Sequence, residues 1–561
     1  MGQRHLTKYR LFQTPVYTTF RIMATDIIIT HITLKTIPLS RSNAHKMITT
    51  ILLASLILLV SYLYYVTTKK FNYWKKRGVP YAKPVPLLGN YAGYILTKEY
   101  IGSEVQKLCE KFPNEPYFGA FYGTEPVLIP QDPEIIKLIL TKDYAYFSGR
   151  EITDYYHSET ITENLFFSGG DRWKVLKQNL SPLFSIKKMR NMFHLIEKCS
   201  KMLEDMMDYE LAETEVAEVR SLMTRYTLDA ICSVSFGVDT NLMEKDCTNK
   251  NNPFRIMGDM IFEISTYRAL KATARAIWPG VFYGLGFENF PSEIKSFFSK
   301  LVNGICEERQ HKPTSRNDFI DLILAMKTDG KLTFAGDNIW GDKKIELEVD
   351  DDLVVALVVG FFAAGFETSS TSLSMCLYEL AKNEEAQAKA HEEIDEYLKK
   401  TDGKITYESI TEMPYLMACM EETIRLYPVL GVITREVMAD YTMPTGVVLE
   451  KGCRVHLPIY HLNRNPEWFE DPESFRPERL QGKVRPYTFM PFGEGQRICI
   501  GYLLAKMQVI SGLISVLRKY RVSLADGTPL KLKMEPKATV TQPTGGVKLR
   551  FTKREKLELA M

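Results

Sequence analysis

The sequence predicts a mainly α-helical fold with a minor β region, preceded by a single transmembrane helix near the amino terminus. Three observations support this prediction. Long apolar segments at helical spacing dominate the chain, alternating segments are few and short, and one uncharged run of 19 residues precedes them. The chain has 561 residues, of which 45% are hydrophobic, so it can bury a large core.

Residues 1–46 differ in composition from the rest of the chain. They hold seven Lys or Arg against the single acid Asp26, a bias typical of mitochondrial presequences, but serine is sparse. Met47 stands where a start codon would give an ordinary membrane-anchored protein. We therefore expect residues 1–46 to be a disordered leader or an upstream extension of the coding sequence.

Residues 47–68 form the predicted transmembrane anchor. The run Ile48–Val66 (ITTILLASLILLVSYLYYV) would cover about 28 Å as a helix, close to the roughly 30 Å of a bilayer's hydrocarbon core. Five basic residues follow it within eleven positions, whereas only Arg41 and Lys46 lie close before it. The positive-inside rule therefore predicts a cytosolic location for the rest of the chain. A cleaved signal peptide is the alternative, but the run is long and lacks a clear A-x-A exit.

The remainder is predicted as a hinge and one large domain. Residues 69–90 are basic and proline-rich, and Pro80, Pro84 and Pro86 favour an extended connector. No Gly/Ser linker divides residues 91–561. Within them, apolar periodicity predicts helices, and alternation predicts strands. The helices are expected at Asp350–Asn383, Tyr415–Arg425 and Ile500–Arg518, and the strands at Tyr117–Ile129 and Gly446–Leu457.

Charge and cysteine content exclude several classes of function. The formal charge of +3 is nearly balanced, and no long basic run carries interleaved aromatic residues, so nucleic-acid binding has little support. The nine cysteines are scattered without CxxC spacing, which argues against a zinc site and a disulfide framework. Such usage is typical of a reducing compartment.

Cys499 stands in the stretch PFGEGQRICIG (491–501), directly before a predicted helix. A helix amino terminus directs free N–H groups and a positive dipole end toward the sulfur. A thiolate is a good iron ligand when its pKa is lowered and water is excluded. Gly493 and Gly495 permit a tight turn, and Gly501 allows a flat ligand to approach the backbone.

Two further side chains of this stretch suit the same ligand. Arg497 can neutralise a carboxylate through a charge-assisted hydrogen bond, and Phe492 offers an apolar wall. Porphyrin, which is flat and bears two propionates, fits these features. A buried structural cysteine before a helix is the alternative interpretation.

Phe492, Gly495, Arg497, Cys499 and Gly501 match the pattern F-x-x-G-x-R-x-C-x-G, so the chain resembles the cytochromes P-450. The resemblance implies the cytochrome P-450 fold for residues 91–561. It also implies haem b (iron protoporphyrin IX) as cofactor, with Cys499 as the axial ligand of the iron.

Two other motifs appear in the order that this family has. In ACMEETIRLYP, Glu422 and Arg425 can pair on one helix face, and the resemblance adds Arg479 to a buried structural network with them. In AAGFETSS, Thr368 can bond back to the Ala364 carbonyl, and the resemblance implies that Glu367 and Thr368 relay protons. The alternative for this motif is a threonine that only bonds back and an acid that reaches solvent.

Three weaker matches concern the haem propionates. Trp173 and Lys177 stand where the family has W-x-x-x-R, so lysine replaces arginine and loses the bidentate geometry. Arg435 matches a frequent propionate partner by position only, and a surface arginine is the alternative there.

The resemblance implies a monooxygenase that inserts one oxygen atom from O₂ into a lipophilic small molecule, either a xenobiotic or an endogenous hormone or lipid. Electrons would come from NADPH–cytochrome P-450 reductase of the endoplasmic reticulum, with cytochrome b5 as a further candidate donor. The chain would be a single-pass protein in contact with membrane lipid. The basic face expected to receive the reductase comprises Lys174, Lys177, Lys187, Lys188, Arg190, Lys483 and Arg485.

Within the family, GVPYAKPVPLLGN, AAGFETSSTSLSMCLYELA and PFGEGQRICIGYLLAKMQ resemble insect microsomal enzymes that handle xenobiotics. Substrate contacts are expected at 152–167, 354–368, 429–434 and 538–544. Four phenylalanines are predicted to form an apolar pocket: Phe166, Phe167, Phe361 and Phe362.

Three alternatives remain open on the sequence alone. A haem-thiolate isomerase or dehydratase tends to lose the acid–threonine pair, which is intact here. A mitochondrial hydroxylase fed by a ferredoxin is favoured by the basic leader and opposed by the anchor. A haem sensor or carrier needs no proton relay.

Overall fold

The computed structural model describes residues 41–244, 251–314, 318–334 and 344–555. Most of the predicted leader, residues 1–40, lies outside the described residues. The chain divides into two compact units between Val66 and Thr67.

The first unit is described from helix α2 (Arg41–Thr68), which begins six residues before the predicted anchor at 47–68. From His45 to Thr68 it is long and apolar enough to span a membrane, with a mean hydropathy of 2.1, and its apolar side chains are exposed. The hydroxyls of Thr49 and Thr50 donate to the carbonyls of His45 and Lys46 at 2.8 and 2.9 Å. These bonds satisfy both hydroxyl donors without water, as a membrane interior requires.

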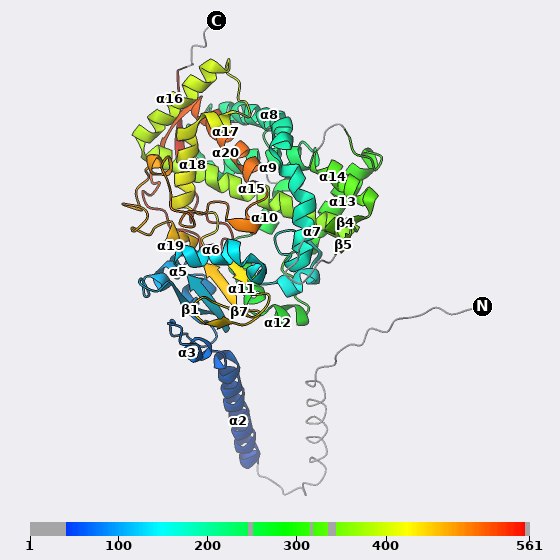
Figure 1. The fold of residues 1–561 in the computed structure, drawn as a ribbon, viewed down its shortest axis with the longest axis vertical. Coiled ribbons are helices and arrows are strands. Elements are labelled where there is room, and N and C mark those ends of the chain that lie inside the picture. Colours follow the sequence, from blue (N-terminus) through cyan, green and yellow to red (C-terminus); the bar gives the residue numbers. More distant parts are fainter. Residues whose placement is uncertain (1–40, 245–250, 315–317, 335–343, 556–561) are drawn as a thin grey trace, which may run out of the picture. The chain divides into compact units, whose positions relative to one another are not determined.

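The second unit is mainly helical, as predicted (Figure 1). Its longer helices are α5 (Ile101–Cys109), α7 (Gly170–Leu180), α8 (Ile186–Glu210), α9 (Val219–Phe236), α10 (Pro253–Ile261), α11 (Thr266–Ile277), α13 (Ser292–Glu308), α14 (Phe319–Asp329), α15 (Asp351–Lys382), α16 (Glu384–Lys400), α18 (Pro414–Leu426) and α20 (Tyr502–Leu517). Its short helices are α3 (Tyr73–Lys76), α4 (Ala92–Ile95), α6 (Pro133–Lys137), α12 (Pro279–Gly284), α17 (Ser409–Glu412) and α19 (Ile459–Leu462).

The β region is minor and divided among small sheets. The largest has the strand order β1 (Tyr117–Tyr122), β2 (Glu125–Pro130), β9 (Arg454–Leu457) and β6 (Ile433–Glu436). Only β2 and β9 pair in parallel in it. A second sheet has the order β10 (Tyr520–Leu524), β11 (Lys548–Lys553) and β3 (Val216–Glu218). Two hairpins complete the described strands, β4 (Lys331–Phe334) with β5 (Ile345–Glu348) and β7 (Tyr441–Thr442) with β8 (Val448–Leu449).

Helix α15 is the centre of the core, where it packs against α9, α18 and α20 (Figure 1). Its amino terminus is capped by the Asp350 carboxylate, which accepts from the Leu353 N–H at 2.7 Å. It is apolar enough to span a membrane, but most of it is buried within this unit. A side chain at Gly365 would lie 2.3 Å from Ile231 of α9, so glycine permits the close packing of these two helices.

The segment predicted as a hinge, residues 69–90, belongs to the second unit. Trp74 is fully buried, and its Nε1 donates to the Ala120 carbonyl at 2.9 Å. Gly119 leaves room for this indole, because a Cβ there would lie 2.3 Å from the ring.

Candidate active site

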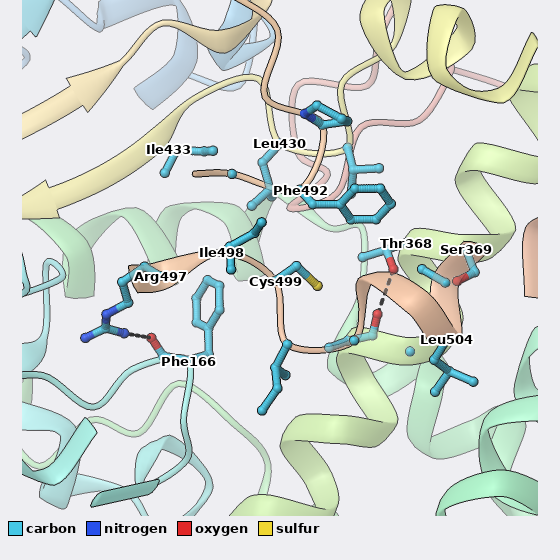
Figure 2. A pocket seen from close by; sticks show the side chains of 18 of the residues that line it. Phe166, Thr368, Ser369, Leu430, Ile433, Phe492, Arg497, Ile498, Cys499 and Leu504 are labelled. Atoms are coloured by element: carbon cyan, nitrogen blue, oxygen red, sulfur yellow. Dashed lines mark hydrogen bonds between the residues drawn. The ribbon is translucent and has the colours of Figure 1, made fainter. Parts of the chain in front are cut away.

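A cavity of about 330 Å³ lies between α15 and the loop that precedes α20. The loop contributes Phe492, Arg497, Cys499 and Gly501 to its lining, and α15 contributes Leu357, Gly360, Phe361, Ala364, Gly365 and Thr368. Trp173, Lys177 and Arg435 also line it. Side chains from distant parts of the sequence therefore meet at one site (Figure 2).

The loop geometry turns Cys499 toward this cavity. Gly493 and Gly495 have φ angles of 75° and 72°, as their predicted role in a tight turn requires. A Cβ at Gly495 would lie 2.0 Å from the Leu140 carbonyl oxygen, so glycine at this position allows the loop to pack against the backbone at Leu140. The turn is closed by the Cys499 N–H, which donates to the Phe492 carbonyl at 2.9 Å.

Cys499 differs from the other described cysteines because it alone is exposed. Figure 2 shows its sulfur directed into the cavity, on the side where Thr368 lies. Because the cavity lies deep in the fold, burial raises the pKa of the thiol, whereas the Gly501 N–H and the Lys177 ammonium lower it. Helix α20 begins at Tyr502, two residues later than the predicted start at Ile500, with Gly501 as its N-cap.

Three guanidinium groups gather at one end of the cavity. Arg435 and Arg497 are 1% and 8% exposed, and Arg150, which the sequence analysis missed, lines the same space. Burial and the positive charge of Arg497 lower the pKa of Arg435. Burial and the positive charges of Arg435 and Arg497 lower the pKa of Arg150. The Nε atoms of all three have no hydrogen-bond partner among the described residues.

This cluster fits the haem that the sequence predicts. Arg435 Nη1 donates to the Thr434 carbonyl at 2.8 Å, and Arg497 Nη2 donates to the Ser148 carbonyl at 2.7 Å, so carbonyl oxygens orient both side chains. Burying cations is costly without an anion nearby, and the two propionates of haem would supply it. The space beside Gly501 is open, because a Cβ there would meet only Phe184, at 3.8 Å. This open space fits the prediction that a flat ligand approaches the backbone at Gly501.

Replacement of Arg435 by methionine is expected to weaken haem retention about tenfold, the scale of one lost hydrogen bond to a charged group. The rate of haem transfer to apomyoglobin measures this effect. Arg435→Lys keeps the charge but loses the planar fork, so its transfer rate should be intermediate. A transfer rate equal to that of the wild type in Arg435→Met would contradict the assignment.

Trp173 and Lys177 lie on α7 beside the same cluster. The Trp173 ring is buried, and the Arg497 guanidinium lies over it at 4.6 Å from the centroid. Lys177 Nζ donates to the Ile498 carbonyl at 3.4 Å, next to Cys499. Lys177 therefore lies near both the sulfur and the cationic cluster.

On α15, the neighbouring residues Glu367 and Thr368 point to different sides of the helix. Thr368 lines the cavity, and its Oγ1 donates to the Ala364 carbonyl at 2.7 Å, the predicted back-bond (Figure 2). Glu367 is 1% exposed, does not line the cavity, and pairs with Arg220 of α9. The described helix α15 is continuous from Asp351 to Lys382.

Glu422, Arg425 and Arg479 meet in one buried network outside the cavity. Glu422 and Arg425 have fully buried side chains joined by two hydrogen bonds of 2.7 and 2.8 Å. Arg479 Nε donates to the same carboxylate at 2.9 Å. Arg425 Nη1 also donates to the carbonyls of Asn463 and Pro472, at 2.8 and 2.7 Å, so the network connects α18 to the chain before the Cys499 loop.

The predicted substrate segments meet the cavity only in part. Phe166 and Phe361 line it, but Phe167 and Phe362 do not, so the four-phenylalanine pocket is wrong for two members. Phe362 faces the core, where its ring lies 5.0 Å from that of Phe298. Residues 538–544 also lie outside the lining: Thr541 instead donates to the Pro428 carbonyl at 2.6 Å and supports the loop that does line it.

Comparison with known proteins agrees with this geometry. The family model described as Cytochrome P450 matches residues 79–551. Cytochrome P450 6B2 of Helicoverpa armigera is 34% identical over 507 residues, which span 90% of this chain and 98% of the relative. Cytochrome P450 6k1 of Blattella germanica is 33% identical over 515 residues, 90% of this chain and 96% of the relative. Cytochrome P450 6a2 of Drosophila melanogaster is 33% identical over 515 residues, which span 89% of this chain and 99% of the relative.

The predicted resemblance to insect members of the family is therefore confirmed, as is the fold. Haem is the cofactor of this family, and its chemistry is the incorporation of oxygen from O₂. The chain belongs to the cytochrome P450 family and is a haem-thiolate monooxygenase.

Proposed function

We propose that the chain oxidises lipophilic small molecules, xenobiotics or endogenous hormones and lipids, with electrons from NADPH through cytochrome P450 reductase at the endoplasmic reticulum membrane. The observation that supports this best is the cavity itself. Its lining is mostly apolar, with Cys499 and Thr368 both in it. Such a lining favours an apolar ligand, because few polar groups are available to replace the water that a polar ligand loses.

The proposed haem site consists of Cys499 as the iron ligand, with Arg435, Arg497, Arg150, Trp173 and Lys177 at the propionates. When bound, haem supplies the activation of dioxygen and the transfer of oxygen. The chain's own contribution is to orient the haem, exclude water from the sulfur and position a proton donor. Burial raises the pKa of Cys499, and the Gly501 N–H and Lys177 oppose this rise and so favour the thiolate form.

Thr368 is proposed to position the proton that the reaction needs. Because its hydroxyl hydrogen is donated to the Ala364 carbonyl, its oxygen lone pairs remain available to accept a hydrogen bond in the cavity. Glu367, one residue earlier, remains part of the proposed proton relay. In this structure the buried Glu367 carboxylate pairs with Arg220, whose side chain is 25% exposed. The ion pair therefore extends from the buried side of α15 to solvent.

Replacement of Thr368 by valine is expected to lower the yield of product per NADPH consumed by at least about tenfold. The reason is that positioned proton transfer typically contributes a factor of about 10² or more to rate. Product, NADPH and hydrogen peroxide measured together give this yield. Thr368→Ser keeps the hydroxyl and should retain most of it, whereas an unchanged yield in Thr368→Val would contradict the role.

Two surfaces support the proposed partners. The basic face proposed for the reductase includes residues of two helices and of the chain before the Cys499 loop. On α7 they are Lys174 and Lys177, on α8 they are Lys187, Lys188 and Arg190, and before the loop they are Lys483 and Arg485.

Lipid contact is supported by α2 and, within the second unit, by exposed apolar side chains on and beside α11 and α12: Tyr267, Leu270, Val281, Leu285 and Phe287. Apolar side chains gathered in this way are typical of membrane or protein contact.

The experiment that tests this function is oxygen uptake by the full chain in lipid vesicles. We expect uptake that depends on NADPH, on cytochrome P450 reductase and on an added lipophile. Uptake driven by a ferredoxin and not by the reductase would indicate the mitochondrial type of hydroxylase. Rearrangement of a lipid peroxide without any reductant would indicate an isomerase and overturn the proposal.

A further inference from the structure

Four polar side chains lie together in the cavity where α15 packs against α20, here called the polar corner. They are Thr368, Ser369 and Ser372 on α15 and Gln508 on α20, and all four line the cavity. Because each residue of a helix turns by about 100°, the three α15 side chains fall within one face that is about 100° wide. Figure 2 shows Ser369 beside Thr368, on the side away from Arg497. The polar corner is therefore separate from the cluster of guanidinium groups.

Gln508 is the most deeply buried member of the polar corner, with an exposure of 1%. Its Oε1 accepts from the Ser369 hydroxyl at 2.9 Å, and this bond fixes the orientation of the amide. Its Nε2 carries two N–H donors and has no hydrogen-bond partner among the described residues. A buried N–H without an acceptor is costly. The nitrogen therefore indicates a ligand in the cavity that offers an acceptor atom.

The backbone of Gln508 is held by a third helix. The Tyr226 hydroxyl of α9 donates to the Gln508 carbonyl at 3.0 Å, and the Ser200 hydroxyl of α8 lies 3.3 Å from the Tyr226 oxygen. Gly512, about one turn later in α20, permits this contact, because a Cβ there would lie 2.9 Å from the Tyr226 ring. Both the backbone and the side chain of Gln508 are thus fixed, so its amide cannot turn to another acceptor without losing the Ser369 bond.

The three hydroxyls of the polar corner are available as acceptors. The Thr368 hydroxyl donates to the Ala364 carbonyl at 2.7 Å, and the Ser372 hydroxyl donates to the Thr368 carbonyl at 3.0 Å. The Ser369 hydroxyl donates to Gln508. Because each hydrogen is already used, each oxygen offers lone pairs to the cavity. Water can accept from the amide and donate to hydroxyl oxygens, and a buried water typically makes about three hydrogen bonds.

We propose that Gln508 is a positioning residue that holds a water molecule in the polar corner, and that this water keeps a hydrogen-bond donor at Thr368. The water accepts from Gln508 Nε2 and donates to the hydroxyl oxygens of Thr368 and Ser372. This inference rests on the proposed function, because it takes Thr368 as the residue that positions the proton. The donor reaches Thr368 from the α20 side, whereas Glu367 points to a different side of α15 and pairs with Arg220.

Ser511 and Ser515 of α20 provide matched controls. They are 0% and 1% exposed, and their hydroxyls also have no hydrogen-bond partner among the described residues. Neither side chain lines the cavity, whereas Gln508 does. Their replacement by alanine therefore removes a buried polar group from the same helix without reaching the polar corner.

A crystal structure of the haem-loaded protein tests the water site directly. We expect an ordered water within about 3.2 Å of Gln508 Nε2 and of the Thr368 or Ser372 hydroxyl. Gln508→Met keeps an unbranched side chain of similar length but has no N–H donor, so this variant should lose the water. Ser515→Ala should retain it. Absence of the water from the wild type would overturn the inference.

The yield of product per NADPH consumed tests the role of this water. With ethoxycoumarin as the lipophilic probe, Gln508→Met should lower the yield about fivefold, the scale of one hydrogen bond. Ser369→Ala removes the donor that orients the amide, so it should lower the yield as well. Ser511→Ala and Ser515→Ala should leave it unchanged.

A double variant separates positioning from a general structural effect. Because the water acts through Thr368, Gln508→Met should cause no further loss of yield in a Thr368→Val background, whereas losses from an independent structural effect would add. An additive loss would overturn the inference, as would an unchanged yield in both Gln508→Met and Ser369→Ala. Wild-type protein that holds the water but forms no product with NADPH and the reductase would overturn the proposed function, and with it the role of the water.

Discussion

Replacement of Cys499 by alanine is expected to abolish both the thiolate-type Soret shift with carbon monoxide and the monooxygenase activity. Cys499 alone among the described cysteines is exposed, and it lines the same cavity as Thr368. Alanine removes the one cysteine of the described cavity lining, and losing a thiolate ligand removes the electron donation that favours O–O cleavage. The reduced protein with carbon monoxide gives the spectrum directly.

Two variants make this result specific. Cys499→His supplies a neutral nitrogen ligand, so we expect haem to bind without the thiolate-type shift. Cys306→Ala removes a buried cysteine of α13 that does not line the cavity, and it should keep the wild-type spectrum. A thiolate-type spectrum in Cys499→Ala would show that another side chain holds the iron.

Replacement of Glu422 by alanine is expected to destabilise the folded protein by about 3–5 kcal/mol, the cost of removing one partner from a buried ion pair. Glu422 accepts from Arg425 and Arg479, and the Glu422 and Arg425 side chains are fully buried. Without the carboxylate, two guanidinium groups lose their anion. Urea unfolding followed by far-ultraviolet circular dichroism measures the free energy of unfolding, and the yield of haem-loaded protein should fall with it.

The neighbouring residue offers a matched control. Glu421 lies on the same helix, α18, and pairs with Lys506 at 3.2 Å, but its side chain is 24% exposed. Glu421→Ala should cost less than about 1 kcal/mol, because water screens and replaces an exposed pair. Equal losses in the two variants would show that the buried network contributes no more than a surface ion pair.

Short-range features of this molecule could be predicted from the sequence. The tight turn before Cys499 depends on glycines at fixed spacing, and Gly493 and Gly495 do adopt positive φ angles. The Thr368 back-bond joins residues one helical turn apart, and α15 begins within one residue of its expected start. In each case the residues that determine the geometry are close in the chain.

The errors concern which side of an element a residue faces. Phe362 was placed at the cavity, but α15 is apolar on several faces, so periodicity could not tell which face meets α9 and which meets the cavity. Arg150 was missed because nothing in its local sequence distinguishes it from a surface arginine. Its role emerges only beside Arg435 and Arg497, which lie hundreds of residues away.

The sequence by itself determined the family, the chemistry of the thiolate ligand, and the apolar helix near the amino terminus, because each depends on residue types at short, regular spacing. Only the tertiary structure decided which side chains share the cavity and that Glu367 of α15 pairs with Arg220 of α9. Those contacts join residues separated by more than a hundred positions, and long-range packing rather than local propensity selects them.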